Sequence, residues 1–178
     1  MLQRLLTLGA AMLTALAAGC GDGPATIAGT WRSPAAWSSL VYATSKGPLL
    51  IEVHGAPFAE APAEFRTTLA MMMTNRVFGR PTAFTADPAV APQPRYRVVL
   101  AFNPAPATDA RDLCQGTVAV SADAVAENAR LTVQAAFCDG ATVLASIQGW
   151  VAKVGGSKDR RFVQLMEQLT RELFGSPP

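Results

Sequence analysis

The sequence predicts an α+β fold: a two-layer sandwich in which two helices cover one face of a mixed sheet of about five strands. Two segments carry apolar residues at helical spacing, and several others alternate with the two-residue period of strands. The first helix lies between two strands, which favours a right-handed crossover that makes those strands parallel. The expected order is strand, helix, four strands, helix (β-α-β-β-β-β-α).

The first strand and the first helix are predicted at residues 49–54 and 62–78. Apolar residues alternate in the strand, and Gly55 ends it. Pro62 suits the first turn of a helix, where the N–H that proline lacks has no partner within the helix. The apolar stripe of this helix consists of Phe65, Leu69, Met72, Met73 and Val77.

Four more strands and a second helix are predicted in the C-terminal half. The first of these strands, 95–103, has strict alternation, and three further strands are expected at about 116–125, 129–137 and 141–153. The final helix, 158–174, is expected to begin after a Ser157 cap. Its apolar stripe consists of Phe162, Leu165, Met166, Leu169 and Leu173.

The turn at Asp139-Gly140 determines the expected register of the last hairpin. A three-residue loop at 138–140 would pair Phe137 with Ala141, whereas a two-residue loop would mix apolar and polar residues on both faces. The first register is therefore predicted. It places on one face Leu131, Val133, Ala135, Phe137, Val143, Ala145, Ile147 and Val151. The other face would carry polar residues suited to solvent or a partner, namely Arg97, Thr132, Gln134, Ser146 and Gln148.

The N-terminus has the features of a secretory signal. Arg4 precedes an uncharged apolar run over residues 5–18, and small residues lead into Cys20. A membrane-spanning helix needs about 20 apolar residues, so this run is too short to span. We expect residues 1–19 to be a cleaved signal peptide, with a plain secretory signal and a short membrane anchor as the alternatives.

Residues 16–20, Leu-Ala-Ala-Gly-Cys, resemble the lipobox of bacterial lipoproteins, with alanine at the second position where leucine is commonest. The resemblance implies cleavage before Cys20 and acylation of its thiol by chains such as palmitate. Residues 20–47 are then expected to form a lipidated N-terminus and tether, and 48–178 a single α+β domain. Because Gly21 rather than aspartate follows Cys20, we expect residence at the outer membrane, facing the periplasm.

In element order and size, the predicted domain is similar to small envelope-biogenesis lipoproteins, such as the lipopolysaccharide-assembly lipoprotein and auxiliary lipoproteins of lipid-transport complexes. This resemblance implies a non-enzymatic docking or assembly component with an envelope protein as its partner. The alternative is a lipoprotein that binds lipid or a small molecule in an apolar pocket between the first helix and the sheet. The candidate ligand or partner surface consists of Met71, Met72, Phe78, Trp31 and Trp37; packing in the core, or over the sheet edge, is the alternative role for these residues.

The three cysteines suggest one disulfide. If Cys20 carries lipid, Cys114 and Cys138 remain as a pair in an exported chain, and oxidising compartments favour a bond between them. A metal site is the alternative, but neither residue has a histidine or second cysteine at metal-ligand spacing.

The remaining composition argues against several functions. The chain has 15 lysines and arginines against 13 acidic residues, and phosphate binding by nucleic-acid partners needs clustered basic residues. His54 is the sole histidine, and no nucleophile, dinucleotide or metal motif is present. Gly155-Gly156 is interpreted as a turn rather than an anion site, and residues 158–161 as a solvated surface. We therefore expect no enzyme activity, no cofactor and no nucleic-acid partner.

Overall fold

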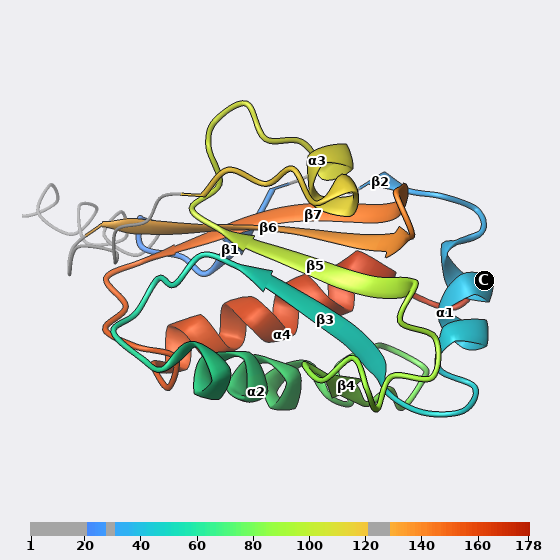
Figure 1. Cartoon of the computed structure of the whole chain (residues 1–178). Coiled ribbons are helices and arrows are strands. Elements are labelled where there is room, and N and C mark those ends of the chain that lie inside the picture. The colour runs from blue at the N-terminus through green and yellow to red at the C-terminus, as the bar shows by residue number, and fades with distance from the viewer. Residues whose placement is uncertain (1–20, 28–30, 121–128) are drawn as a thin grey trace, which may run out of the picture.

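The computed structural model describes residues 21–27, 31–120 and 129–178 (Figure 1). The predicted signal peptide and Cys20 lie outside these residues. In chain order the elements are β1 (Ala25–Thr26), β2 (Trp31–Arg32), α1 (Ala36–Ala43), β3 (Leu49–His54), α2 (Pro62–Met73), β4 (Phe84–Thr85), β5 (Tyr96–Phe102), α3 (Ala110–Gln115), β6 (Arg130–Asp139), β7 (Thr142–Ala152) and α4 (Arg160–Phe174). No helix among these is long and apolar enough to cross a membrane.

All of these strands join one mixed sheet in the order β1-β7-β6-β5-β3-β4, with β2 also paired to β7. β3 and β5 are parallel, as the helix between them predicts, and β5, β6 and β7 form an antiparallel meander. The α+β class and the mixed sheet are therefore confirmed. The described part of the chain holds more strands and more helices than the prediction of about five strands and two helices.

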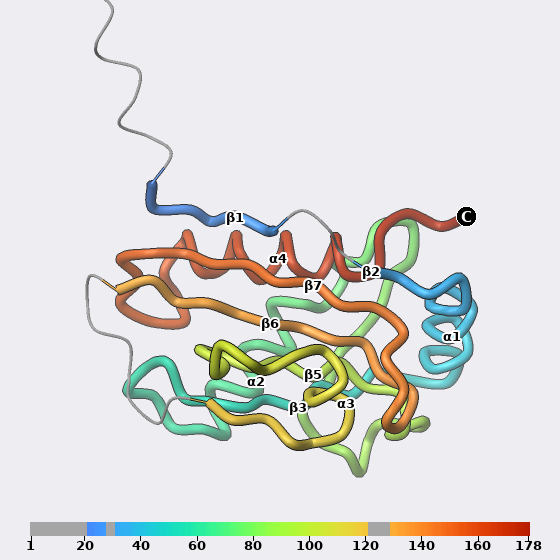
Figure 2. The backbone as a smooth tube through the Cα atoms, turned by 90° about the horizontal axis from the view of Figure 1, so that it is seen from above, coloured from blue at the N-terminus to red at the C-terminus, as the bar shows by residue number. Residues whose placement is uncertain are grey.

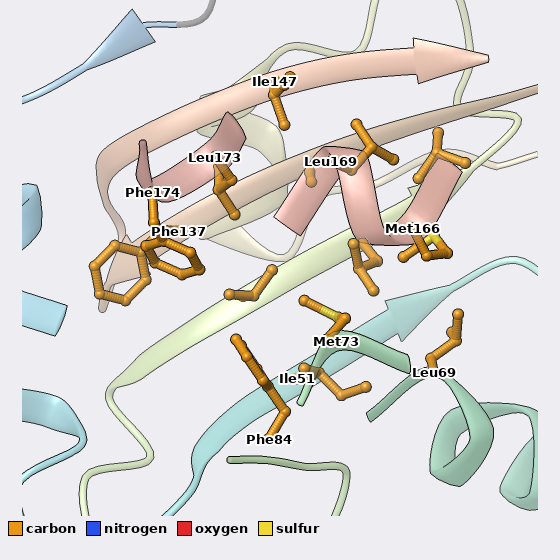
Figure 3. Packing of buried hydrophobic residues seen from close by; sticks show 14 of the residues in the cluster. Ile51, Leu69, Met73, Phe84, Phe137, Ile147, Met166, Leu169, Leu173 and Phe174 are labelled. Carbon is orange, nitrogen blue, oxygen red and sulfur yellow. The ribbon is translucent and has the colours of Figure 1, made fainter. Parts of the chain in front are cut away.

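The main core lies between the sheet and the two predicted helices, α2 and α4, which cover the same face (Figure 1). Side chains from both helices interlock there with β3, β5, β6 and β7 (Figure 3). The buried residues of the two helix stripes are Phe65, Leu69, Met73, Phe162, Leu165, Met166, Leu169 and Leu173. Met72 is only partly buried. α2 ends earlier than predicted, because Thr74 is extended and its hydroxyl donates to the carbonyl of Ala70.

The strand predicted at 116–125 is wrong over its described part, and its residues 121–125 lie outside the described chain. The short helix α3 comes just before it, and Val120 makes only an isolated bridge with Pro104. A capping box starts α3: Asp109 accepts from the backbone of Asp112, whose side chain accepts from Asp109. β5 therefore pairs directly with β6.

α3 covers the sheet face opposite α2 and α4, so the prediction of a two-layer domain is incomplete. Leu113 is buried in a second cluster on this face, and Cys114 forms the predicted disulfide with Cys138, with 5.5 Å between their Cα atoms. The other members of this cluster are Val99, Ala101 and Ala136. The disulfide thus joins α3 to the end of β6, an inner strand of the sheet.

The predicted register of the last hairpin is also wrong. Asp139 pairs with Thr142 across a two-residue turn, and a bulge between Phe137 and Cys138 pairs Phe137 with Ala145 rather than Ala141. The bulge adds one residue, Leu144, to β7, which restores the apolar face that a plain two-residue turn would lose. All the predicted residues of that face keep their place except Val143, which packs beside the disulfide.

The N-terminal segment expected to be a tether is largely part of the fold. β1 and β2 pair with the outer edge of β7, and α1 is anchored by the fully buried Leu40. The structured domain therefore begins well before residue 48. The final helix is capped by Asp159 rather than by Ser157, since the Asp159 side chain accepts from the backbone of Arg161.

Loss of the disulfide should strongly destabilise this domain. The cysteines are 24 residues apart, and closing a ring of that size stabilises a fold by about 3 kcal/mol through the lost entropy of the unfolded chain. We expect Cys114→Ala with Cys138→Ala to lower the free energy of unfolding in urea by about that amount. Reduced wild-type protein should behave like the double variant. Equal stability of the oxidised wild type and the double variant would contradict the prediction.

Candidate functional site

The chain enters the sheet immediately after the predicted lipid site. The carbonyl of Asp22 accepts a hydrogen bond of 2.7 Å from the backbone of Ala152, at the end of β7. The Asp22 carboxylate lies 3.0 Å from the Nζ atom of Lys153. Further along, Ile27 donates to the carbonyl of Gln148. Asp22, two residues after Cys20, is therefore held by both its backbone and its side chain.

Basic and aromatic side chains surround this entry point. The guanidinium of Arg130 lies 4.0 Å from the centre of the Trp150 ring, in cation–π geometry. Arg161 donates to the backbone carbonyl of Lys153. These contacts connect the start of β6, the end of β7 and the start of α4. Figure 2 shows that this end of the sheet lies opposite α1 and the C-terminus.

The candidate surface residues do not form one patch. Trp31, Met71 and Phe78 are 51%, 65% and 59% exposed, whereas Trp37 and Met72 pack partly against the core. Trp31 pairs with a residue of β7 at the sheet edge. Met71 and Phe78 line two separate surface hollows.

The Phe78 hollow has a volume of about 390 Å³ and lies where β2 meets the end of α4. Arg32 forms part of its wall, since its Nε donates to the carbonyl of Leu173 over 3.1 Å, and its Nη2 donates to that of Glu172. The lining residues are Arg32, Phe78, Arg171, Glu172, Gly175 and Ser176. Aromatic and arginine side chains are enriched at protein–protein interfaces relative to other protein surfaces.

The pocket expected between the first helix and the sheet is filled by side chains. Phe65, Leu69 and Met73 of α2 are buried against the sheet and α4. A hollow of about 40 Å³ lies at the start of α2 beside Phe58, which is far smaller than the roughly 300–1,000 Å³ of a typical ligand pocket. The larger hollow at Met71, about 410 Å³, is open to solvent on the outer side of α2.

A charged cluster that the sequence analysis missed lies on the α3 face. Glu52 Oε1 is 2.8 Å from His54 Nε2, and Glu52 Oε2 accepts from Arg97 Nε over 2.7 Å. The hydrogen bond from His54, opposed by burial and assisted by Arg97, lowers the pKa of Glu52 from 4.5 to about 2. The alternation of β3 and β5 places all three residues on one face, which is the signal that could have identified them.

This cluster connects α3 to the sheet. Arg97, predicted on a solvent or partner face, is only 17% exposed and also donates to the carbonyls of Cys114 and Gly140, over 3.0 and 3.1 Å. One guanidinium thus holds the end of α3, the hairpin turn and Glu52 together. These three contacts account for the burial of Arg97 on a face that was predicted to meet solvent or a partner.

The glycine pair before α4 lies beside carboxylates. Glu60 accepts from the backbone and the hydroxyl of Ser157, over 2.9 and 2.7 Å. An open hollow here is lined by Glu60, Glu64, Gly155, Gly156, Lys158 and Asp159. Three acidic side chains make this an unfavourable place for an anion. Over residues 21–27, 31–120 and 129–178, no three histidines, cysteines or acidic residues are grouped to hold a metal ion.

Comparisons with known proteins give little guidance. No protein-family model matches the chain, and no curated protein does. Among solved structures, a PelC dodecamer from Paraburkholderia phytofirmans is similar at 14% identity and a TM-score of 0.38, covering 84% of this chain and 94% of that chain. A similarity this low assigns neither activity nor partner.

The Glu52 cluster should make stability depend on pH. Because folding lowers the pKa of Glu52 from 4.5 to about 2, its contribution is complete above 4.5 and is lost as the pH falls toward 2. We expect the stability advantage of the wild type over Glu52→Gln to shrink over this interval in urea titrations. Glu64→Gln, which alters an exposed glutamate in the first turn of α2, is the control. A constant advantage at every pH would contradict the assignment.

Proposed function

We propose that this chain is a lipid-anchored lipoprotein of the cell envelope that faces the periplasm and acts as a non-enzymatic docking or assembly component. The observation that supports the proposal is the hydrogen bond from the backbone of Ala152, at the end of β7, to the carbonyl of Asp22. An acyl group on Cys20 would hold the whole domain close to a membrane, because the fold begins two residues later. The disulfide between Cys114 and Cys138 also supports export to an oxidising compartment.

The Phe78 hollow is the surface that best suits a protein partner. It lies beside β2 and the end of α4. Figure 2 shows that β2 lies toward α1 and the C-terminus, away from the start of β1. Phe78 offers an exposed aromatic ring, and Arg171 an exposed guanidinium, next to Arg32. Such a position would leave the docking surface accessible while the lipid end is occupied.

Lipid or small-molecule binding is the second candidate function. The open hollow between α2 and residues 84–87 favours it, because Met71 is highly exposed there and several small apolar side chains lie around it. Methionine adapts to ligands of varied shape. The filled space beneath α2 restricts such a ligand to the outer surface.

The anchor is tested by Cys20→Ala in cells that produce the full chain. We expect mass spectrometry to find the wild-type chain cleaved before Cys20 and acylated there, and outer-membrane fractions to contain it. The variant should lose the acyl mass, whereas the disulfide variant Cys114→Ala with Cys138→Ala should keep it. Wild-type protein with an unmodified Cys20 and an intact leader would contradict the proposal.

Docking is tested by placing a photo-crosslinking amino acid at Phe78 in the same cells. We expect one envelope protein to be crosslinked, and the yield to fall when Cys20→Ala removes the anchor. A crosslinker at Gln115, an exposed residue of α3, is the matched control for random collisions. Equal capture from Phe78 and Gln115 would contradict docking here. Capture of lipid alone from Met71 would support the second candidate.

A further inference from the structure

We propose that one end of the domain lies directly against the phospholipid headgroups of the membrane that holds Cys20. This membrane-facing end is defined by Asp22, Gly23, Arg130, Trp150, Lys153 and Arg161. The inference rests on the proposed acylation of Cys20 and goes beyond it, because a lipid anchor alone leaves open which surface of the domain meets the membrane.

The length of chain between lipid and fold carries the inference. An extended residue spans at most about 3.6 Å, so the Cα atoms of Cys20 and Asp22 lie at most about 7 Å apart. The headgroup layer on each side of a bilayer is about 5–8 Å thick. Asp22 is fixed to the end of β7 through Ala152 and Lys153. This end of the sheet therefore reaches the headgroups as soon as the acyl chains are inserted.

The chain stays close to the domain over the next residues as well. Gly23 has a left-handed φ of 72°, and a Cβ added there would lie 2.8 Å from the carbonyl oxygen of Trp150 and 3.2 Å from its ring. The backbone after Asp22 thus packs directly on Trp150, and Ala25 pairs with Trp150 in the sheet. Because residues 22–25 are held against β7, they cannot extend to let the domain move away from the lipid.

The side chains at this end suit a headgroup layer. Tryptophan rings favour the membrane–water interface, and Trp150 is half-buried with the exposed Arg130 stacked over it. Arginine can donate two hydrogen bonds to one phosphate. Lys153 and Arg161 add positive charge, which Asp22 and Asp159 partly balance. The short chain between Cys20 and Asp22 is therefore the main reason why the membrane-facing end contacts the headgroups. This contact does not require a strongly anionic membrane.

The opposite end of the domain is then directed away from the bilayer. β7 has 11 residues, so it extends about 35 Å from the membrane-facing end. The turn at its other end lies on the side of the domain that carries α1 (Figures 1 and 2).

The test uses the full acylated protein in vesicles of phosphatidylethanolamine and phosphatidylglycerol that contain a lipid with a nitroxide on its headgroup. The chain has three tryptophans, so two single-tryptophan forms can be compared. Trp31→Phe with Trp37→Phe leaves Trp150, and Trp31→Phe with Trp150→Phe leaves Trp37 of α1 as the control. Circular dichroism and an intact disulfide check that each form is folded. We expect the fluorescence of Trp150 to be quenched several-fold more strongly than that of Trp37.

A flexible insertion tests the role of the short connection. Twelve Gly and Ser residues between Gly21 and Asp22 would add an average reach of about 20 Å, so quenching of Trp150 should fall. The same segment after Ser176 should leave it unchanged.

The possible results separate the two proposals. Both results below require protein whose Cys20 acylation has been verified by mass spectrometry. If Trp150 and Trp37 are quenched equally, or if the insertion leaves the quenching of Trp150 unchanged, the proposal of a membrane-facing end is wrong. The proposal of a lipid anchor is then unaffected. An unmodified Cys20 overturns both.

Discussion

The pairing of β7 with the chain just after Cys20 is the constraint on which the rest of the structure depends. β7 is the strand that meets most of the fold: β6 along one edge, β1 and β2 along the other, and α4 across one face. Gly149 allows this crowding, because a Cβ there would lie 2.9 Å from the carbonyl oxygen of Ala25 and about 3 Å from two leucines of α4. The N-terminal strand β1 and the core helix α4 are thus packed against the same residue.

The two faces of the sheet are stabilised by different means. On the α4 face, the main stabilising contribution is the burial of large apolar side chains. Phe137 and Phe174, for example, pack edge to face with 5.2 Å between their ring centres (Figure 3). On the α3 face the apolar cluster is small, and a disulfide and the Arg97 cluster add to it. The six-residue helix α3 buries only Leu113 and Cys114, so the disulfide and the charged hydrogen bonds add to the small hydrophobic area on this face.

The sequence predicted the parts of the fold that depend on neighbouring residues along the chain. The stripes of α2 and α4 follow from helical spacing, and β3, β5 and β7 from alternation. The strand expected at 116–125 failed because the capping box at Asp109 starts a helix just ahead of it. The predicted hairpin register is wrong because a bulge at Leu144, opposite Phe137 and Cys138, adds a residue to β7, and patterns of alternation assume that none is added. For the candidate surface, the sequence identified exposed residues such as Met71 and Phe78 and placed them together, whereas the structure separates them into two hollows.

The sequence by itself determined the α+β class, the parallel pair formed across α2, the two core helices and the cysteine pair, because each depends on local spacing or on simple counting. Only the tertiary structure decided that the segment after Cys20 is a sheet edge rather than a tether, since β1 and β2 are two-residue strands that exist through their pairing with β7. The same is true of Arg97, whose partners come from β3, α3 and the hairpin turn. Contacts between segments far apart in the chain leave no periodic signal in the sequence, so they are seen only in the folded structure.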